Sequence, residues 1–222
     1  MLHQEAGNIS FRHQFEIRNA LKDALGYLGI IHISMDLVRP DGEMIILSGT
    51  PSHAYEICSR GYDRYDSTIS PEYYQNHSFY WWYNVEHKGC GREINYIRRV
   101  KLGFFYGFML VRRWDDFYLV YSFAAGRKEA NFIEKAYDSL NDLLRIGDEI
   151  YMNLRGLYAQ YTDEFVPPLI DQFYPFVPGK PIPRYSNYYQ SREGLMMPRA
   201  HEGGKVFHGL QLVVDNDLVE QG

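Results

Sequence analysis

The sequence feature that most constrains the fold is a long amphipathic segment, residues 129–160. Apolar residues recur there every three or four positions over about nine turns, which is the spacing of one face of an α-helix. Such a face needs an equally long apolar partner, and a β-sheet can supply one. Gly147, in the middle of the face, indicates a bend or a tight crossing. The face consists of Ile133, Tyr137, Leu140, Leu144, Gly147, Tyr151, Leu154 and Tyr158.

Two segments upstream predict that sheet. Residues 30–38 and 43–48 are rich in strand-forming residues, and the Pro40-Asp41-Gly42 turn between them is typical of a hairpin. Residues 103–113 and 117–124 predict a second hairpin around residues 114–116, apolar enough for a buried, central position. Gly107 inside this hairpin predicts a bulge, or a close approach by a ligand or another backbone.

Helices complete the order. We expect an amphipathic helix over residues 10–27, capped by Ser10 and with Phe11 and Phe15 on its apolar face, and short helices near residues 52–60 and 90–101. The basic side of the last one, which includes Arg98, is expected to be solvated. Two hairpins without crossover helices form an antiparallel sheet, and the helices can cover both of its faces. The predicted fold class is α+β, a three-layer αβα sandwich similar to PAS and GAF domains.

The character of the chain changes after Thr162. Prolines at 167, 168, 175, 178, 181 and 183 interrupt regular structure. We therefore expect one domain over residues 1–162 and a proline-rich arm over residues 163–222, with a last strand near residues 206–214. The arm shows no recognition-helix pattern, so no recognisable helix-turn-helix is expected in it.

Composition excludes several classes of function. The net charge of -5 gives no basic field for nucleic acid, and direct nucleic-acid binding by this chain is not expected. Two cysteines without a CxxC pair fit a reducing compartment, and no signal peptide or membrane span is seen, so we expect a cytoplasmic protein. No nucleophile motif, phosphate loop or metal-ligand spacing is present. We expect no catalytic residues, no metal and no cofactor.

An aromatic stretch, residues 62–83, carries most of the functional information. It combines Tyr, Phe and Trp with polar residues and Asp66, which is the make-up of one wall of a small-molecule site. The alternative is core packing, because the same side chains are the largest core fillers, and composition alone favours packing.

Residues 52–81, which read SHAYEICSRGYDRYDSTISPEYYQNHSFYW, resemble the signal-binding domain of LuxR-type transcription regulators. The resemblance extends over about residues 10–161. It implies that Asp66 accepts a hydrogen bond from a ligand amide, that Tyr62, Trp81 and Trp82 line the pocket, and that Ser122 faces it. The alternatives are a turn Asp, a core Trp and a strand Ser that points to solvent.

Two departures from the family pattern change the expected ligand and partners. His53 stands where the family has its lactone-binding Trp, and Ser67 stands where a Pro usually follows the Asp, so acyl-homoserine lactones are not the expected ligands. The family's C-terminal helix-turn-helix has no counterpart in residues 163–222.

Two hypotheses of different classes follow. The first is a non-enzymatic sensor domain that binds a partly apolar small molecule between sheet and helices and couples binding to a homodimer or partner equilibrium. The second is a degenerate, antiactivator-like sensor that needs no ligand and acts by contact with a regulator protein. A third, an enzyme or carbohydrate-binding protein, lacks a pair of converging carboxylates or a nucleophile with its base.

Overall fold

The computed structural model describes residues 2–162 except 4, 115 and 130, together with residues 167–170, 173 and 175 and four short strands further on. Its centre is a five-stranded antiparallel sheet in the order β2-β1-β5-β4-β3. The strands are β1 (Ile30–Val38), β2 (Met44–Ser48), β3 (Phe79–Trp81), β4 (Tyr106–Trp114) and β5 (Phe117–Ala125). Both predicted hairpins are confirmed, β1 with β2 and β4 with β5.

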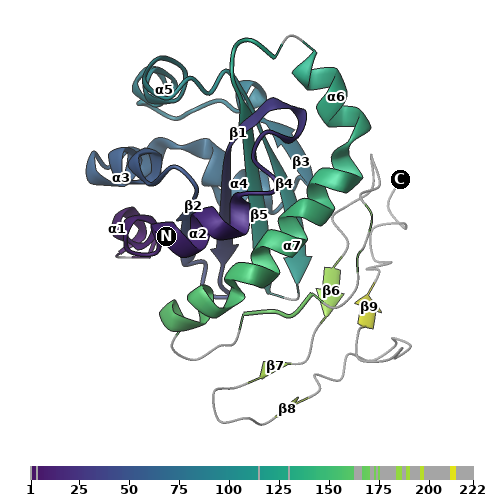
Figure 1. Cartoon of the computed structure of the whole chain (residues 1–222). Coiled ribbons are helices and arrows are strands. Elements are labelled where there is room, and N and C mark those ends of the chain that lie inside the picture. Colours follow the sequence, from purple (N-terminus) through teal and green to yellow (C-terminus); the bar gives the residue numbers. More distant parts are fainter. Residues whose placement is uncertain are drawn as a thin grey trace, which may run out of the picture.

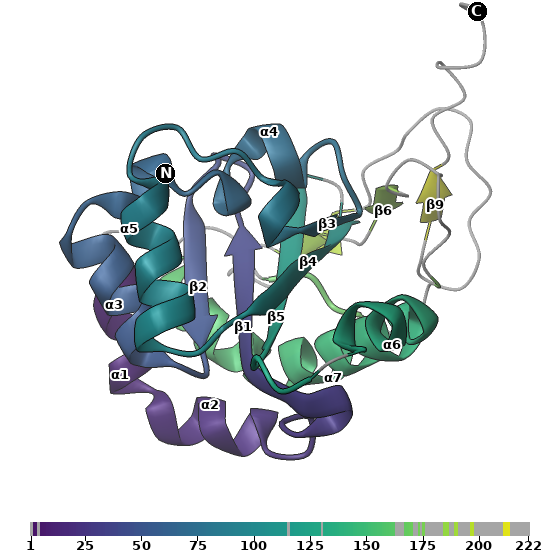
Figure 2. The ribbon, with the colours of Figure 1, turned by 90° about the horizontal axis from the view of Figure 1, so that it is seen from above.

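Helices cover both faces of the sheet, as the view in Figure 2 shows. The α-helices are α1 (Ala6–Arg12), α2 (Gln14–Leu21), α3 (Pro51–Ser59), α4 (Pro71–Tyr74), α5 (Gly91–Asn95), α6 (Phe132–Asp138) and α7 (Leu140–Tyr158). Short 3-10 turns are η1 (Tyr27–Gly29), η2 (Tyr62–Tyr65), η3 (Ser67–Ile69), η4 (Trp82–Asn84) and η6 (Ala159–Tyr161), and η5 (Tyr96–Lys101) is a π-helix. The predicted α+β, three-layer sandwich is confirmed.

The two faces of the sheet differ in chemistry because strand residues alternate between them. Ile33, Met35 and Leu37 of β1 enter the main core, which α2, α6 and α7 cover. His32, Ser34 and Asp36 of the same strand are buried on the opposite face, below α3, α4 and α5. That second face therefore contains buried polar and charged groups as well as apolar ones.

The long segment forms two helices instead of one, because the chain bends at Ser139 between α6 and α7. Gly147 marks a tight crossing, since a Cβ at this position would lie 2.4 Å from the ring of Tyr121 on β5. Beside it, the buried Asp148 accepts hydrogen bonds from Arg112 on β4 and from the Tyr121 hydroxyl at 2.9 Å. The predicted helix-on-sheet packing is thus anchored by a polar contact as well as by the apolar face.

The N-terminal prediction was wrong in two respects. Residues 10–27 do not form one helix, because α1 ends at Arg12 and α2 ends at Leu21. Ser10 is not a cap; it is buried inside α1, where its hydroxyl donates to the carbonyl of Ile46 and accepts from the backbone N–H of Ser48 on β2. Phe15 is 80% exposed, and Ile9, Ile17 and Leu21 form the buried face instead.

Most of the predicted C-terminal arm lies outside the described residues. Within it, β6 (Arg184–Ser186) pairs in parallel with the end of β4, β9 (Gln211–Val213) pairs with β6, and β7 (Tyr189–Gln190) pairs with β8 (Met196–Met197). Strand β9 falls in the range predicted for a last strand. The division into a domain and an arm stays a prediction.

Candidate ligand-binding site

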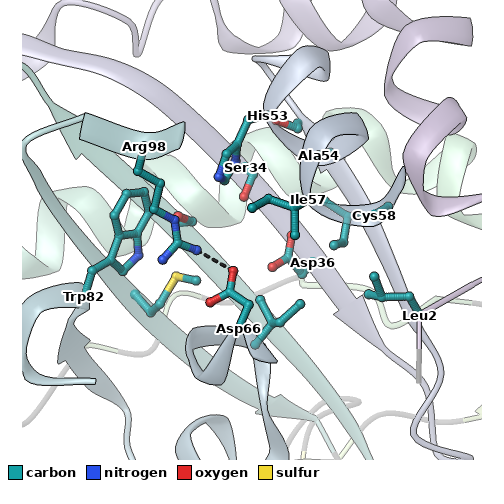
Figure 3. Close-up of a pocket in the computed structure, with 15 residues that line it drawn as sticks. Leu2, Ser34, Asp36, His53, Ala54, Ile57, Cys58, Asp66, Trp82 and Arg98 are labelled. Atoms are coloured by element: carbon teal, nitrogen blue, oxygen red, sulfur yellow. Dashed lines mark hydrogen bonds and ion pairs between the residues drawn. The ribbon is translucent and has the colours of Figure 1, made fainter. Parts of the chain in front are cut away.

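A small cavity lies on the polar face of the sheet, between its central strands and the segments α3, η3 and η5 (Figure 3). Its volume is about 40 Å³, room for roughly three water molecules. Apolar and polar side chains share the lining. They are Leu2, Ser34, Asp36, Ile46, Ser48, His53, Ala54, Ile57, Cys58, Asp66, Ile69, Trp82, Arg98, Met109 and Ser122.

A buried ion pair stands on one side of the cavity. The Nη2 atom of Arg98 lies 2.6 Å from Oδ2 of Asp66, and the side chains of both residues are 3% exposed. Asp66 precedes η3, where its Oδ1 accepts hydrogen bonds from the hydroxyl of Thr68 at 2.6 Å and from the Thr68 backbone N–H at 3.2 Å. The Arg98 guanidinium lies 4.3 Å above the ring of Trp82, within the range of a cation–π contact. Arg98 thus donates a hydrogen bond to Asp66, which is the role that the resemblance assigned to the amide of a ligand.

The π-helix η5 is the element that brings Arg98 inside. Residues 92, 98, 99 and 101 were expected to form one solvated basic side, and Arg92, Arg99 and Lys101 are indeed exposed. Arg98 is buried, so that expectation was wrong for this residue. Single π-turns are frequent at functional sites.

A second carboxyl group, that of Asp36, stands across the cavity in the middle of β1 (Figure 3). Asp36 is 2% exposed. Burial, and then the charge of Asp66, raise the pKa of Asp36 to about 8, opposed by a hydrogen bond with Ser34 and by the charge of Arg98. Asp36 is therefore mostly protonated at neutral pH.

Two histidines adjoin this pair of carboxyl groups. Burial is the main reason that the pKa of His32 falls to about 3 and that the pKa of His53 falls well below its usual value, and the charge of Arg98 adds to both shifts. Both rings are thus neutral at pH 7. They contact each other edge to face at 5.5 Å, and His32 stacks on Phe104 at 4.5 Å.

Several buried polar atoms of the lining have no hydrogen-bond partner among the described residues. These atoms are Oδ1 of Asp36, Nε2 of His53, Nε1 of Trp82, and Nε and Nη1 of Arg98. Buried polar groups in native proteins are nearly always hydrogen-bonded, to protein or to ordered water. In this protein, atoms without such a partner are concentrated around one cavity.

The structure brings together four of the six residues that the sequence nominated. His53, Asp66, Trp82 and Ser122 all line the cavity. Gly107 was expected at a bulge or at a close approach by a ligand or another backbone, but a side chain approaches it instead: a Cβ there would lie 2.2 Å from the indole ring of Trp82.

Tyr62 and Trp81 do not line this cavity. Tyr62 lies in η2 and borders a separate open cleft of about 340 Å³, together with Tyr96 of η5. Trp81 is 1% exposed and belongs to the main core on the opposite face, where its Nε1 donates to the hydroxyl of Tyr137 at 2.9 Å. Adjacent residues at the end of β3 thus have different surroundings: Trp81 is in the core and Trp82 is at the cavity.

Arg98, Asp36 and Ser34 were not nominated from the sequence. A signal for two of them was present, because His32, Ser34 and Asp36 alternate with apolar residues in a strand that is buried on both faces. In an antiparallel sheet such alternation usually marks a solvated face, so only the burial of the strand identifies this stripe as a polar interior. Arg98 gave no such signal, because in the sequence it belongs to a run of basic residues together with Arg99 and Lys101.

The lining gives no support to nucleophilic or metal chemistry. Cys58 and His53 both line the cavity, but burial raises the pKa of the Cys58 thiol to about 12, which disfavours the thiolate. No cluster of three or more His, Cys, Asp or Glu side chains suited to a metal ion occurs among the described residues. None of the helices in the described part of the chain has the length and apolarity that a membrane span requires.

No protein-family model matches this chain, and no curated protein matches its sequence. Among solved structures it is similar to Escherichia coli SdiA, with a TM-score of 0.51 and 14% identity, over 68% of this chain and 65% of that one. Two weaker similarities are to the N-acylhomoserine lactone dependent LuxR family transcription factor CepR2 from Burkholderia cenocepacia (TM-score 0.44, 14% identity, 65% and 96% covered) and to SdiA in complex with octanoyl-rac-glycerol (0.42, 11%, 65% and 60%).

At these identities the similarity concerns the fold alone. The fold is that of the signal-binding domain of LuxR-type transcription regulators, in a divergent sequence, which confirms the resemblance at the level of architecture. The chain spans 65% of the length of the SdiA chain that it matches.

Proposed function

We propose that this chain is a signal-sensing domain that binds a small molecule in the cavity between the sheet and α3. The observation that carries the proposal is the set of buried polar atoms without partners around that cavity. His53, Asp66, Trp82 and Ser122 are the proposed contact residues, with Asp36 and Arg98 added from the structure. The role is binding rather than catalysis, in the cytoplasm.

The ligand would differ from the partly apolar molecule that the sequence suggested. Ile46, Ile57 and Met109 supply apolar walls, but two carboxyl groups, a guanidinium and a histidine lie among them. In a volume of about 40 Å³ a long acyl chain has no room. A small polar molecule fits the space and the unpaired atoms better.

Native mass spectrometry of the purified chain, followed by denaturing extraction, tests the proposal. A stoichiometric compound should co-purify and should be lost from Asp66→Asn and Trp82→Ala. The matched control is Tyr83→Ala, because Tyr83 is adjacent to Trp82 but 53% exposed and outside the cavity. If the wild-type chain and every variant each show only the mass of their own bare polypeptide, ligand sensing is contradicted.

Binding would be coupled to assembly through a shift of a homodimer equilibrium. The exposed aromatic residues of the N-terminal helices, Phe11 and Phe15, are the proposed contact surface together with α7. Sedimentation of the chain with and without its co-purified compound measures this. Direct contact with nucleic acid is not part of the proposal.

One observation favours the alternative of an antiactivator-like protein that needs no ligand. Arg98 already pairs with Asp66. A side chain of the protein itself therefore occupies the position expected for a ligand, and only a cavity of about 40 Å³ remains. This reading predicts co-purification with a full-length LuxR-type regulator and no effect of Asp66→Asn on that contact beyond its effect on stability.

A further inference from the structure

The cavity holds two carboxyl groups that share a single cationic side chain. Two carboxyl groups, those of Asp36 and Asp66, face a single guanidinium, that of Arg98, and Arg98 is the only Lys or Arg among the described residues that line the cavity. The hydrogen bond from Arg98 goes to Asp66 at 2.6 Å, whereas Oδ1 of Asp36 has no partner among the described residues. Asp36 therefore stays mostly protonated in the free protein at pH 7, and its ionisation would require one more positive charge beside it.

No other group near Asp36 can supply that charge. His53 and His32 are neutral at pH 7 because burial lowers the pKa of both rings. The remaining ionisable groups that act on Asp36 or are acted on by it are acidic or uncharged at this pH, apart from Arg98. They are Asp66, Cys58 on α3, Tyr80 on β3 and Tyr158 on α7.

We propose that the cavity is selective for a small organic cation, an amine or amidine that also carries a neutral hydrogen-bond acceptor, with Asp36 as its counter-ion. This inference rests on the proposed ligand-sensing function and deepens it. The cationic group would pair with Oδ1 of Asp36, which is 2% exposed and faces the cavity. The acceptor atom of the ligand would accept hydrogen bonds from the unpaired Nε and Nη1 groups of Arg98.

Charge discriminates against other ligand classes. A carboxylate would add a second negative charge to that of Asp66 with a single guanidinium to balance them, and would oppose ionisation of Asp36, which is unfavourable in a buried site. A neutral molecule would leave Asp36 protonated and would gain only an ordinary hydrogen bond. Charge-assisted hydrogen bonds are about twice as strong as neutral ones.

Selective binding of a cation should be accompanied by a measurable release of protons. Asp36 is mostly protonated in the free protein at pH 7, and it would be ionised when paired with a cation. Binding should therefore release about one proton per cation bound, and affinity should rise as the pH approaches 8. Binding that depends only on the shape of the ligand would release no proton.

The test is isothermal titration calorimetry of the full chain at pH 7, in two buffers of different ionisation enthalpy. The probes are ethanolamine, ethylene glycol and glycolate, which present an ammonium, a hydroxyl and a carboxylate on the same two-carbon unit. Ethanolamine should bind at least about tenfold more tightly than the other two, with release of a proton. Asp36→Asn should weaken ethanolamine binding by about tenfold or more, and Asp142→Asn, which removes an exposed carboxylate of α7, should not.

Equal binding of ethanolamine and ethylene glycol, unchanged affinity in Asp36→Asn, or binding without proton release would each overturn the inference, as would failure of all three probes. None of these results touches the proposed function, which stands or falls on whether a compound co-purifies. An anionic or neutral co-purified compound that needs Asp66 and Trp82 would keep the sensor and refute the cation.

Discussion

Replacement of Asp36 by Asn should stabilise this protein, and the gain should grow with pH. The pKa of Asp36 rises from its ordinary value of 3.8 to about 8 in the folded chain. A group whose pKa is raised by folding contributes stability that is fully present below the unfolded value and is lost as the pH rises through the folded value. The native state of the wild-type chain therefore loses stability between about pH 4 and pH 8.

The magnitude follows from the size of the shift. Each pKa unit corresponds to about 1.4 kcal/mol, so a rise of about four units sets an upper limit of about 6 kcal/mol on the penalty at pH 8. Relaxation of the site and entry of water reduce such penalties to a few kcal/mol. Asn has the same shape and no charge to bury, so we expect Asp36→Asn to gain at least about 2 kcal/mol at pH 8 and little near pH 4.

Urea unfolding followed by circular dichroism, at steps from pH 5 to pH 8.5, measures this. The difference between variant and wild type is the informative quantity, because the lowered pKa values of His32 and His53 add stability as the pH rises towards 6.5 in both proteins. Asp142→Asn on α7 is the charge-matched control and should show no such trend. A difference that is flat with pH, or a loss of stability in Asp36→Asn, would refute the argument that Asp36 is buried without a charge partner.

Three further predictions concern single contacts. Arg98→Met should lower the free energy of unfolding by about 3–5 kcal/mol, because it leaves the carboxylate of Asp66 buried without its cation, and urea unfolding would show a loss below 1 kcal/mol if the pair were dispensable. Within α7, Gly147→Ala should destabilise the protein by about 1–3 kcal/mol, because the added Cβ clashes with Tyr121. Gly156→Ala has no atom within 4 Å of the added Cβ, so it should be neutral or stabilise by up to about 1 kcal/mol. Equal thermal shifts in the two variants would contradict the tight crossing. Trp81→Ala should lower the free energy of unfolding by about 3–5 kcal/mol, because it truncates a core side chain. Any folded fraction of this variant should keep its co-purified compound. Loss of the compound from folded Trp81→Ala would place this residue at the site.

Local patterns determined the secondary structure and the layer order. The Pro40-Asp41-Gly42 turn produces a hairpin because Gly42, at φ +80°, adopts the left-handed conformation that the turn requires. The apolar face of α7 defines a helix that must cover a sheet, and it does. These features depend on neighbours in the sequence, which is why periodicity and turn chemistry are enough to predict them.

Side-chain position depended on contacts between distant segments. Phe15 has the spacing of a core residue and is 80% exposed, because the chain turns at His13 and rotates α2. The pairing of Trp81 with Phe108 decides that Trp81 enters the main core and leaves Trp82 to the cavity. No property of either tryptophan alone distinguishes them.

The candidate site was determined by the sequence in part. Asp66, His53, Trp82 and Ser122 were identified from the resemblance, and they do surround one cavity. Its electrostatics were decided by the tertiary structure, because η5 carries Arg98 from a basic surface segment to Asp66, 32 positions away, and burial then sets the protonation of Asp36. The sequence by itself identified four residues of the site. The packing of distant segments added Asp36 and Arg98, excluded Tyr62 and Trp81, and set the charges, since burial and pairing are properties of the folded chain.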